Sequence, residues 1–329
     1  MLGRPRLAAD LLASAWQVAA FQITEATIDA VVDQRLEQMR RIYPDLQQFC
    51  QRQLGWNCPI STLWHLWLPL ANQLVSWQKA LHRPLLQGIL GGQGTGKTTL
   101  TLILAEILRH FDLRTCRLSI DDLYKTYADR QQLQQVDPRF RWRGPPGTHD
   151  VELGLETLNQ LRQGKHPVAI PRFDKSLHGG AGDRTEPEWL TGADVVLFEG
   201  WFVGVRPVDP QVFATAPAPI QTDADREFAR EVNRRLQDYL PLWDQLDRLL
   251  VLYPSDYRFS QQWRRQAEQH MIASGKSGMS DAEIAEFVEY FWRALHPALF
   301  IQPLLTDAQH VDLVVEIDAN HRPAKIYCP

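Results

Sequence analysis

The feature that most constrains this chain is the glycine-rich segment GGQGTGKTT at residues 91–99. It follows an apolar run at 85–90 and opens a stretch whose apolar spacing predicts a helix over 97–110. Glycine lets such a loop curl so that backbone N–H groups face phosphate oxygens, and the helix N-terminus adds its positive end. The spacing predicts a nucleotide phosphate-binding loop, with Lys97 at the β- and γ-phosphates and the Thr98 hydroxyl on Mg²⁺. We expect the whole loop to contact the nucleotide: Gly91, Gly92, Gln93, Gly94, Thr95, Gly96, Lys97, Thr98 and Thr99.

Short apolar runs alternate with helical stretches from residue 84 onward. The predicted strands are 85–90, 115–120, 168–173, 195–199, 249–253 and 311–318, and the predicted helices are 97–110, 151–163, 223–239, 256–273 and 281–295. This alternation is typical of a mainly parallel sheet flanked by helices. We therefore expect a three-layer α/β fold of the P-loop NTPase type over 81–329. Residues 1–80 instead show apolar side chains at three- and four-residue spacing, which predicts an N-terminal helical extension.

Acidic residues follow two of the predicted strands. The segment SIDDLY at 119–124 places Asp121 and Asp122 after the second apolar run, and VVLFEGW at 195–201 ends its run at Glu199. Phosphoryl transfer to a hydroxyl needs a carboxylate that accepts the proton, and Mg²⁺ needs hard oxygen ligands. The aspartate pair can divide or share these tasks, and Glu199 suits a strand-end acid that supports Mg²⁺. Because an aspartate after a strand is also a common helix cap, capping is the alternative for the pair.

Composition and missing motifs exclude several classes of protein. With 35 Lys and Arg against 39 Asp and Glu, and no long basic run, we expect no nucleic-acid partner. The four cysteines form no CxxC pair, which argues against a disulfide framework or zinc site and favours a cytoplasmic location. No run approaches the ~18 apolar residues of a membrane helix, so no membrane partner is expected. Neither an Asn-Lys-x-Asp guanine motif nor an LSGGQ transporter signature occurs, which leaves a small-molecule kinase as the favoured class.

The segments GGQGTGKTT, SIDDLY, RGPPGTHD, PRFDKSLHGGAGDR and FEGWFVG together resemble the plant- and cyanobacterial-type D-glycerate 3-kinase family. That family is related to uridine kinase, pantothenate kinase and phosphoribulokinase, and the resemblance covers residues 82–329. It implies transfer of the γ-phosphate of ATP to the 3-hydroxyl of D-glycerate, a step that closes the photorespiratory pathway in plants. It also implies that Asp121 is the catalytic base and a Mg²⁺ ligand, with Glu199 as the acid near the ion.

The loops after the strands supply residues that suit an acid with two hydroxyl groups. With the resemblance, we expect D-glycerate to be bound by Asp122, Tyr124, His149, Asp150, Lys175, His178, Arg184 and Arg206. The cations among them would hold the carboxylate or the transferring phosphate. The alternatives are that Asp150 caps the following helix and that His178 is an ordinary loop residue.

Residues 256–273 are expected to form a lid helix that carries Arg258, Arg264 and Arg265. Arginines in such a lid neutralise charge on the transferred phosphoryl group. Because Arg264 and Arg265 are adjacent and cannot point the same way, at most one or two of the three act, and we select Arg264 as catalytic. The segment DANHRP at 318–323 is the candidate for reading adenine.

Two alternatives remain beside a glycerate kinase. The first keeps the kinase and changes the acceptor to a nucleoside, a pentose phosphate or pantothenate. The second is a regulatory ATPase switch whose N-terminal helices bind a partner protein. The acid pair and the basic acceptor loops favour the kinase, which we expect to be a monomer or small homo-oligomer.

Overall fold

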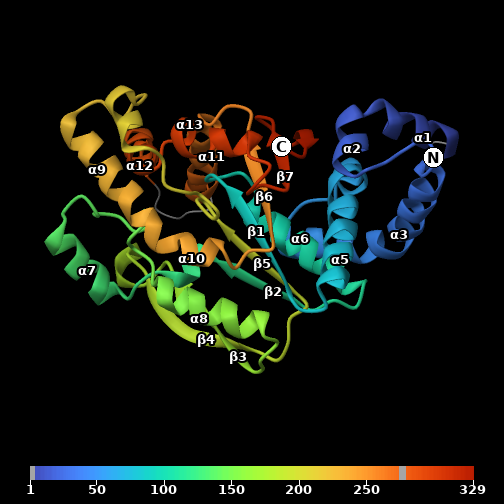
Figure 1. Cartoon of the computed structure of the whole chain (residues 1–329), viewed down its shortest axis with the longest axis horizontal. Coiled ribbons are helices and arrows are strands. Elements are labelled where there is room, and N and C mark those ends of the chain that lie inside the picture. Colours follow the sequence, from blue (N-terminus) through green and yellow to red (C-terminus); the bar gives the residue numbers. More distant parts are fainter. Residues whose placement is uncertain (1–3, 274–278) are drawn as a thin grey trace.

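A six-stranded sheet forms the centre of the computed structural model, which describes residues 4–273 and 279–329 (Figure 1). The strand order is β2-β5-β1-β6-β7-β8; β8 is antiparallel to β7, and the other neighbours are parallel. The strands are β1 (Leu85–Gly91), β2 (Thr115–Ser119), β5 (Val195–Gly200), β6 (Arg248–Pro254), β7 (Leu313–Ile317) and β8 (Pro323–Tyr327). The predicted P-loop fold, a mainly parallel sheet flanked by helices, is confirmed.

One predicted strand lies outside this sheet. β3 (Val168–Asp174) pairs antiparallel with β4 (Asp183–Leu190) in a separate two-stranded sheet. This arrangement corrects the expectation that every apolar run joins the parallel sheet. The sequence DRTEPEWL of β4 gave no strand signal, because most of its side chains are polar and its Trp189 is exposed.

Helices cover both faces of the sheet (Figure 1). On one side lie α1 (Arg4–Ala13), α2 (Ala15–Ala20), α3 (Ile28–Phe49), α4 (Ile60–Thr62), α5 (Leu68–Leu81) and α6 (Lys97–Arg109). The helices that follow α6 in the chain are α7 (Tyr127–Val136), α8 (Val151–Arg162), α9 (Asp223–Arg235), α10 (Leu240–Trp243), α11 (Phe259–Ala273), α12 (Asp281–Ala294) and α13 (Pro297–Phe300). All five helices predicted beyond residue 84 are present. None of the described helices is both long and apolar enough to cross a membrane.

Successive residues of the parallel strands pack into two separate cores. Leu85 and Ile89 of β1 belong to one buried cluster, and Leu86 and Leu90 of the same strand belong to the other. The cause is strand geometry, since neighbouring side chains point to opposite faces of a sheet. An apolar strand of this kind is stable only when both faces are covered.

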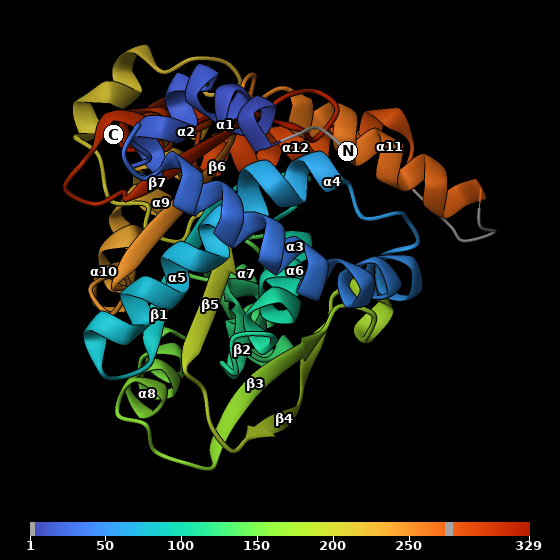
Figure 2. The same ribbon diagram turned by 90° about the vertical axis from the view of Figure 1, so that its right-hand side faces the viewer.

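The N-terminal helices provide one of these covers. Ile42 and Leu46 of α3 and Leu74 of α5 share a cluster with Ile103 of α6 and Ile89 of β1, and all five side chains are 0% exposed. Figure 2 shows α3 and α5 lying across this side of the molecule. We therefore infer that α3 and α5 form an integral layer of the fold.

Truncating a residue of this layer should destabilise the whole chain. We expect Leu74→Ala to lower the free energy of unfolding by about 2–5 kcal/mol, because it leaves a cavity in the shared core. Ser76→Ala, at an exposed position of the same helix, is the matched control and should change stability little. Denaturant unfolding should show a single transition for the whole chain, with its midpoint at a lower denaturant concentration in Leu74→Ala than in the unaltered protein. If the N-terminal helices unfolded in a separate, earlier transition while the sheet stayed folded, the inference that they are an integral layer would be wrong.

Candidate active site

The three predicted site segments meet at one edge of the sheet. Ser119 of β2 is in register with Glu199 of β5, which is in turn in register with Ile89 of β1. The phosphate loop begins just beyond Ile89, and Asp121 lies just beyond Ser119. Because parallel strands all end at the same edge, residues far apart in sequence come together there.

The phosphate loop curls around its own lysine. The Lys97 ammonium donates a hydrogen bond to the backbone carbonyl of Gly92 at 3.0 Å. Burial lowers the pKa of Lys97, and the charges of Glu199 and other nearby acids partly offset this effect. Gly94 has a φ of +79°, and a Cβ there would lie 2.8 Å from the Cβ of Trp263. Both its conformation and its close neighbour therefore require glycine.

Thr98 and Glu199 form the oxygen-rich part of the site. The Thr98 hydroxyl, at the start of α6, donates to the Glu199 carboxylate at 2.8 Å, and Glu199 is only 7% exposed. A hydroxyl beside a carboxylate supplies hard oxygen donors of the kind that Mg²⁺ prefers, with phosphate oxygens and water as its remaining ligands. These two residues fit the ion predicted from the sequence.

Asp121 has a partner on each carboxylate oxygen. The Tyr124 hydroxyl donates to Oδ1 at 2.8 Å, and the Lys175 ammonium donates to Oδ2 at 2.6 Å. Burial raises the pKa of Asp121, but the charge of Lys175 and the hydrogen bonds from Lys175 and Tyr124 outweigh it, so the pKa is lowered overall. Asp121 is therefore ionised at neutral pH, which is the form that accepts a proton.

The neighbouring acid, Asp122, has a different environment. Its Oδ2 accepts a hydrogen bond from the Ser119 backbone N–H at 3.0 Å, completing a capping box on the short 3-10 helix Ile120–Leu123. The same oxygen pairs with Arg172 at 3.1 Å. Burial raises the pKa of Asp122. The capping alternative considered for the pair thus describes the geometry of Asp122.

His149 and Asp150 lie behind Tyr124. The His149 ring stacks on the Tyr124 ring at 4.5 Å between centroids, and its Nδ1 is 2.9 Å from the Tyr239 hydroxyl. Burial lowers the pKa of His149 to about 3, so the imidazole is neutral. Asp150 caps α8 through the Leu153 N–H. Both residues thereby hold the Tyr124 loop in place.

Three further residues predicted to bind D-glycerate have partners outside the lining of the main cavity. His178 pairs with Asp183 at 3.1 Å, and Arg184 pairs with Asp150 at 2.8 Å. Arg206 lines a separate cavity of about 260 Å³. These three side chains do not line the cavity that contains Lys97 and Asp121, and neither do His149 and Asp150, so their contact with D-glycerate stays a prediction.

That cavity has a volume of about 710 Å³ and combines charged and aromatic walls. Its charged lining residues are Lys97, Asp121, Asp122, Arg143, Lys175, Glu199 and Arg264, and its aromatic ones are Tyr124, Trp142, Phe173, Trp201, Trp263, Phe287 and Phe291. Arg143 and Trp142 were missed by sequence reasoning. The signal was available, because the basic and aromatic triplet RWR directly precedes the GPPGTHD segment.

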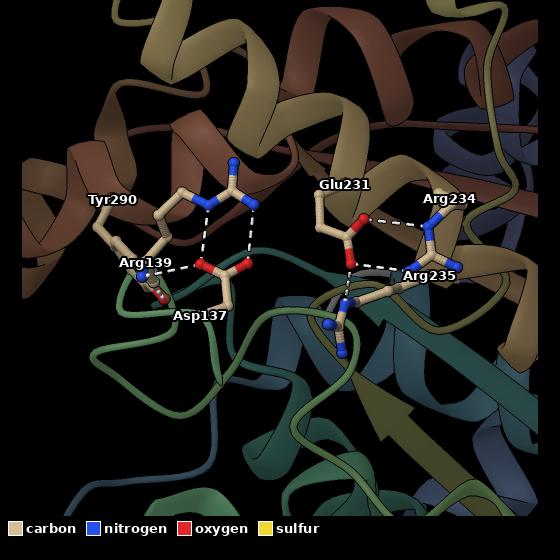
Figure 3. Close-up of polar contacts among 6 residues, drawn as sticks. All are labelled: Asp137, Arg139, Glu231, Arg234, Arg235 and Tyr290. Atoms are coloured by element: carbon tan, nitrogen blue, oxygen red, sulfur yellow. Dashed lines mark hydrogen bonds and ion pairs between the residues drawn. The ribbon is translucent and has the colours of Figure 1, made fainter. Parts of the chain in front are cut away.

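The loop that leads to Trp142 and Arg143 contacts α12 through Arg139 (Figure 3) and α9 through Phe140. The Tyr290 hydroxyl of α12 donates to the Arg139 backbone carbonyl at 3.1 Å. On α9, Glu231 and Arg235 pair at 2.6 Å, and the Arg235 guanidinium lies 4.5 Å from the centre of the Phe140 ring. These contacts place one wall of the cavity on rigid helices.

One of the three arginines expected on the lid helix reaches the cavity. Arg264 of α11 lines it and pairs with Glu268 at 2.5 Å. Arg258 instead pairs with Asp256 at 3.0 Å, and Arg265 lies 3.9 Å from an acid of α12.

The chain is similar in sequence to known kinases. The chain is 32% identical over 257 residues to the uncharacterized kinase mug58 of Schizosaccharomyces pombe, covering 74% of this chain and 92% of the relative. It is also 32% identical over 255 residues to the chloroplastic D-glycerate 3-kinase of Arabidopsis thaliana, covering 73% of this chain. The match spans 54% of that plant protein, or about half its length. No protein-family model matches the chain.

A solved structure shows the same fold. The D-glycerate 3-kinase of Cryptococcus neoformans aligns with a TM-score of 0.72 at 28% identity, covering 80% of this chain and 99% of that chain.

The partners of Asp121 generate a prediction about its titration. Lys175→Met should raise the pKa of Asp121, because it removes the cation that favours the carboxylate. A depressed pKa stabilises the folded protein above the ordinary pKa of aspartate, and this contribution is lost as the pH falls through the folded-state value. Lys175→Met should therefore also make unfolding less dependent on pH in acid. Carbon-13 NMR of labelled aspartate carboxyls, assigned with Asp121→Asn, measures the shift.

The matched control is Lys79→Met, at an exposed position on α5 that does not line the cavity. It should leave the titration of Asp121 unchanged. An unchanged titration in Lys175→Met as well would show that Lys175 does not set the charge of this carboxylate.

Proposed function

The chain belongs to the P-loop kinase family that includes D-glycerate 3-kinase, and we propose that it transfers the γ-phosphoryl group of ATP to the 3-hydroxyl of D-glycerate. It is an ATP-dependent kinase with a small-molecule substrate. The products of the proposed reaction are 3-phosphoglycerate and ADP.

The observation that carries the choice of acceptor is the contact between Lys175 and Asp121, 2.6 Å apart in the cavity that also contains Lys97. Glycerate has a hydroxyl that must lose a proton and a carboxylate that needs a cation. The Asp121 carboxylate can accept the hydroxyl proton, and the adjacent Lys175 ammonium can pair with the carboxylate of glycerate. Arg143 lines the same cavity and adds a planar guanidinium suited to a carboxylate.

The proposed reaction has one bond-forming and one bond-breaking event. The 3-hydroxyl oxygen of glycerate forms a bond to the γ-phosphorus, while the bond from that phosphorus to the β–γ bridging oxygen breaks and ADP leaves. Asp121 accepts the hydroxyl proton. Tyr124 and Lys175 hold the carboxylate ionised and fixed in position for this transfer.

Cations stabilise the charge that spreads over the transferred group. Lys97 does so from the phosphate loop, and Arg264 from α11, which lines the same cavity. We propose that Thr98, Glu199 and Asp121 hold Mg²⁺, which would neutralise charge on the β- and γ-phosphates. The aromatic side chains around the cavity limit the access of water, which would otherwise compete with glycerate.

The direct test is ADP release with Mg²⁺ and ATP across a panel of acceptors. The panel contains D-glycerate, L-glycerate, uridine, pantothenate and ribulose 5-phosphate, with a reaction lacking acceptor as the control. We expect strong stimulation by D-glycerate, with 3-phosphoglycerate identified by phosphorus-31 NMR. Stimulation by a different acceptor would keep the kinase and reject glycerate as its substrate.

Replacing the proposed base should separate chemistry from binding. Asp121→Asn should lower kcat by about 10²- to 10⁴-fold while ATP binding is kept, because the amide cannot accept the proton. Steady-state kinetics and ATP titration give the two quantities.

Asp122→Asn is the matched control, one residue away. The substitution removes the negative charge that pairs with Arg172, but its side-chain oxygen can still accept the hydrogen bond from the Ser119 N–H. We therefore expect this variant to retain most of its turnover. Near-normal turnover in Asp121→Asn would move the role of base to Asp122 or Glu199.

A further inference from the structure

A second cavity lies on the other side of the phosphate loop. Its volume is about 460 Å³, and it is lined by Gly94, Thr95, Gly96 and Thr99 of the loop and the first turn of α6. The cavity described above is lined by the loop residues Gln93, Gly94, Lys97 and Thr98. Gly94 is common to both, so the phosphate loop separates two cavities.

The N-terminal helical layer contributes a wall of this second cavity. Trp56, Asn57 and Pro59, from the connection between α3 and α4, line it together with Trp67. The opposite rim is His321, from the segment between β7 and β8. Parts of the chain more than 200 residues apart therefore meet over the phosphate loop.

The lining of the second cavity suits an uncharged aromatic ring. Among its described lining residues there is no lysine, arginine, aspartate or glutamate, in contrast to the charged cavity on the other side of the loop. Its floor contains Leu252, Val315 and Ile317, and tryptophan stands at its edge. Apolar walls with a few polar groups are typical of small-molecule sites. A phosphate or a carboxylate would find no charged partner here, whereas a purine base needs none.

The connection that carries Trp56 is held in a defined shape. Gly55 turns the chain with a φ of +77°. Cys58, only 4% exposed, donates its backbone N–H to the Gln47 side-chain oxygen of α3 at 2.7 Å. Asn57 accepts hydrogen bonds at its side-chain oxygen from Gln47 at 2.8 Å and from Gln51 at 3.0 Å. The wall is thus preorganised, and the Trp56 ring is 36% exposed.

His321, on the opposite rim, contacts α11, the helix that also lines the first cavity. The His321 ring stacks on Trp263 of α11 at 4.3 Å between centroids. Trp263 packs against Gly94, and Arg264 follows it in the sequence. α11 therefore lines the first cavity and contacts the rim of the second through His321.

Nucleotide geometry connects the two cavities. With the γ-phosphate beside Lys97 and Asp121, the base of ATP extends from the other end of the triphosphate. The third cavity that touches the loop, at Gly92 and Gln93, has a volume of only about 50 Å³ and is too small for a purine. The second cavity has both the volume and the lining that a base requires.

We propose that Trp56, from the N-terminal helical layer, forms the outer wall of the pocket that receives the base of ATP beside the phosphate loop. This proposal rests on the use of ATP in the proposed function but not on the identity of the acceptor. It gives the N-terminal helices a role in nucleotide recognition besides covering the sheet. His321 of the segment DANHRP, expected to read adenine, forms the facing rim.

The test compares nucleotide binding with binding of a probe that has no base. In the full chain, Trp56→Ala should weaken ATP binding by about tenfold, the scale of losing one aromatic stacking surface. It should leave the affinity for inorganic tripolyphosphate unchanged, because that probe occupies only the phosphate loop. Trp56→Phe should restore most of the ATP affinity. Isothermal titration calorimetry in the presence of Mg²⁺ measures all three.

Trp189→Ala is the matched control, since Trp189 is a 65% exposed tryptophan on β4. It should bind ATP like the unaltered protein. Unchanged ATP affinity in Trp56→Ala would overturn the proposal, as would an equal loss for ATP and tripolyphosphate, which would indicate a disturbed phosphate loop. If D-glycerate is not phosphorylated but Trp56→Ala loses ATP selectively, the acceptor assignment fails and the base pocket stands.

Discussion

The structure depends on a parallel sheet that must be buried on both faces. Each strand sends alternate side chains into two cores, so the chain needs a helical layer on each side. Helices after the phosphate loop cover one face, and the N-terminal helices complete the other together with α6. Once the strands are packed in parallel, their carboxyl ends share one edge, and this edge holds the loop, Glu199 and Asp121. The position of the site is therefore a consequence of how the core is buried.

Acids that look equivalent in the sequence have different physical environments. Asp121 has hydrogen-bond partners that favour its charged form and faces the cavity next to Lys97. Asp122, one residue later, completes the capping box that begins at Ser119 and pairs with Arg172. Asp150 caps α8. The difference comes from backbone geometry, because a 3-10 turn points adjacent side chains in different directions. A single residue of spacing thus separates an acid suited to proton transfer from one that supports the loop.

The phosphate loop separates two cavities of opposite character. On one side, several charges surround Lys97, as transfer of a phosphoryl group to an acid requires. On the other side the described lining carries no acid, lysine or arginine, and aromatic side chains form the rim. The N-terminal layer lines the uncharged side, and α11 contacts its rim through the stack of Trp263 on His321. This arrangement gives a physical reason for a kinase to keep its N-terminal helices beside the loop.

The sequence alone determined the features that depend on near neighbours in the chain. The phosphate loop, the five longer helices α6, α8, α9, α11 and α12, and the acids Asp121 and Glu199 after or at strand ends follow from spacing and backbone propensity. Other features required the tertiary structure: that β3 leaves the main sheet, and that Arg143 and not Arg206 lines the cavity with Lys97. Sequence spacing could not reveal them, because they depend on contacts between segments tens to hundreds of residues apart. A side chain's direction and partners are decided only when the layers pack around it.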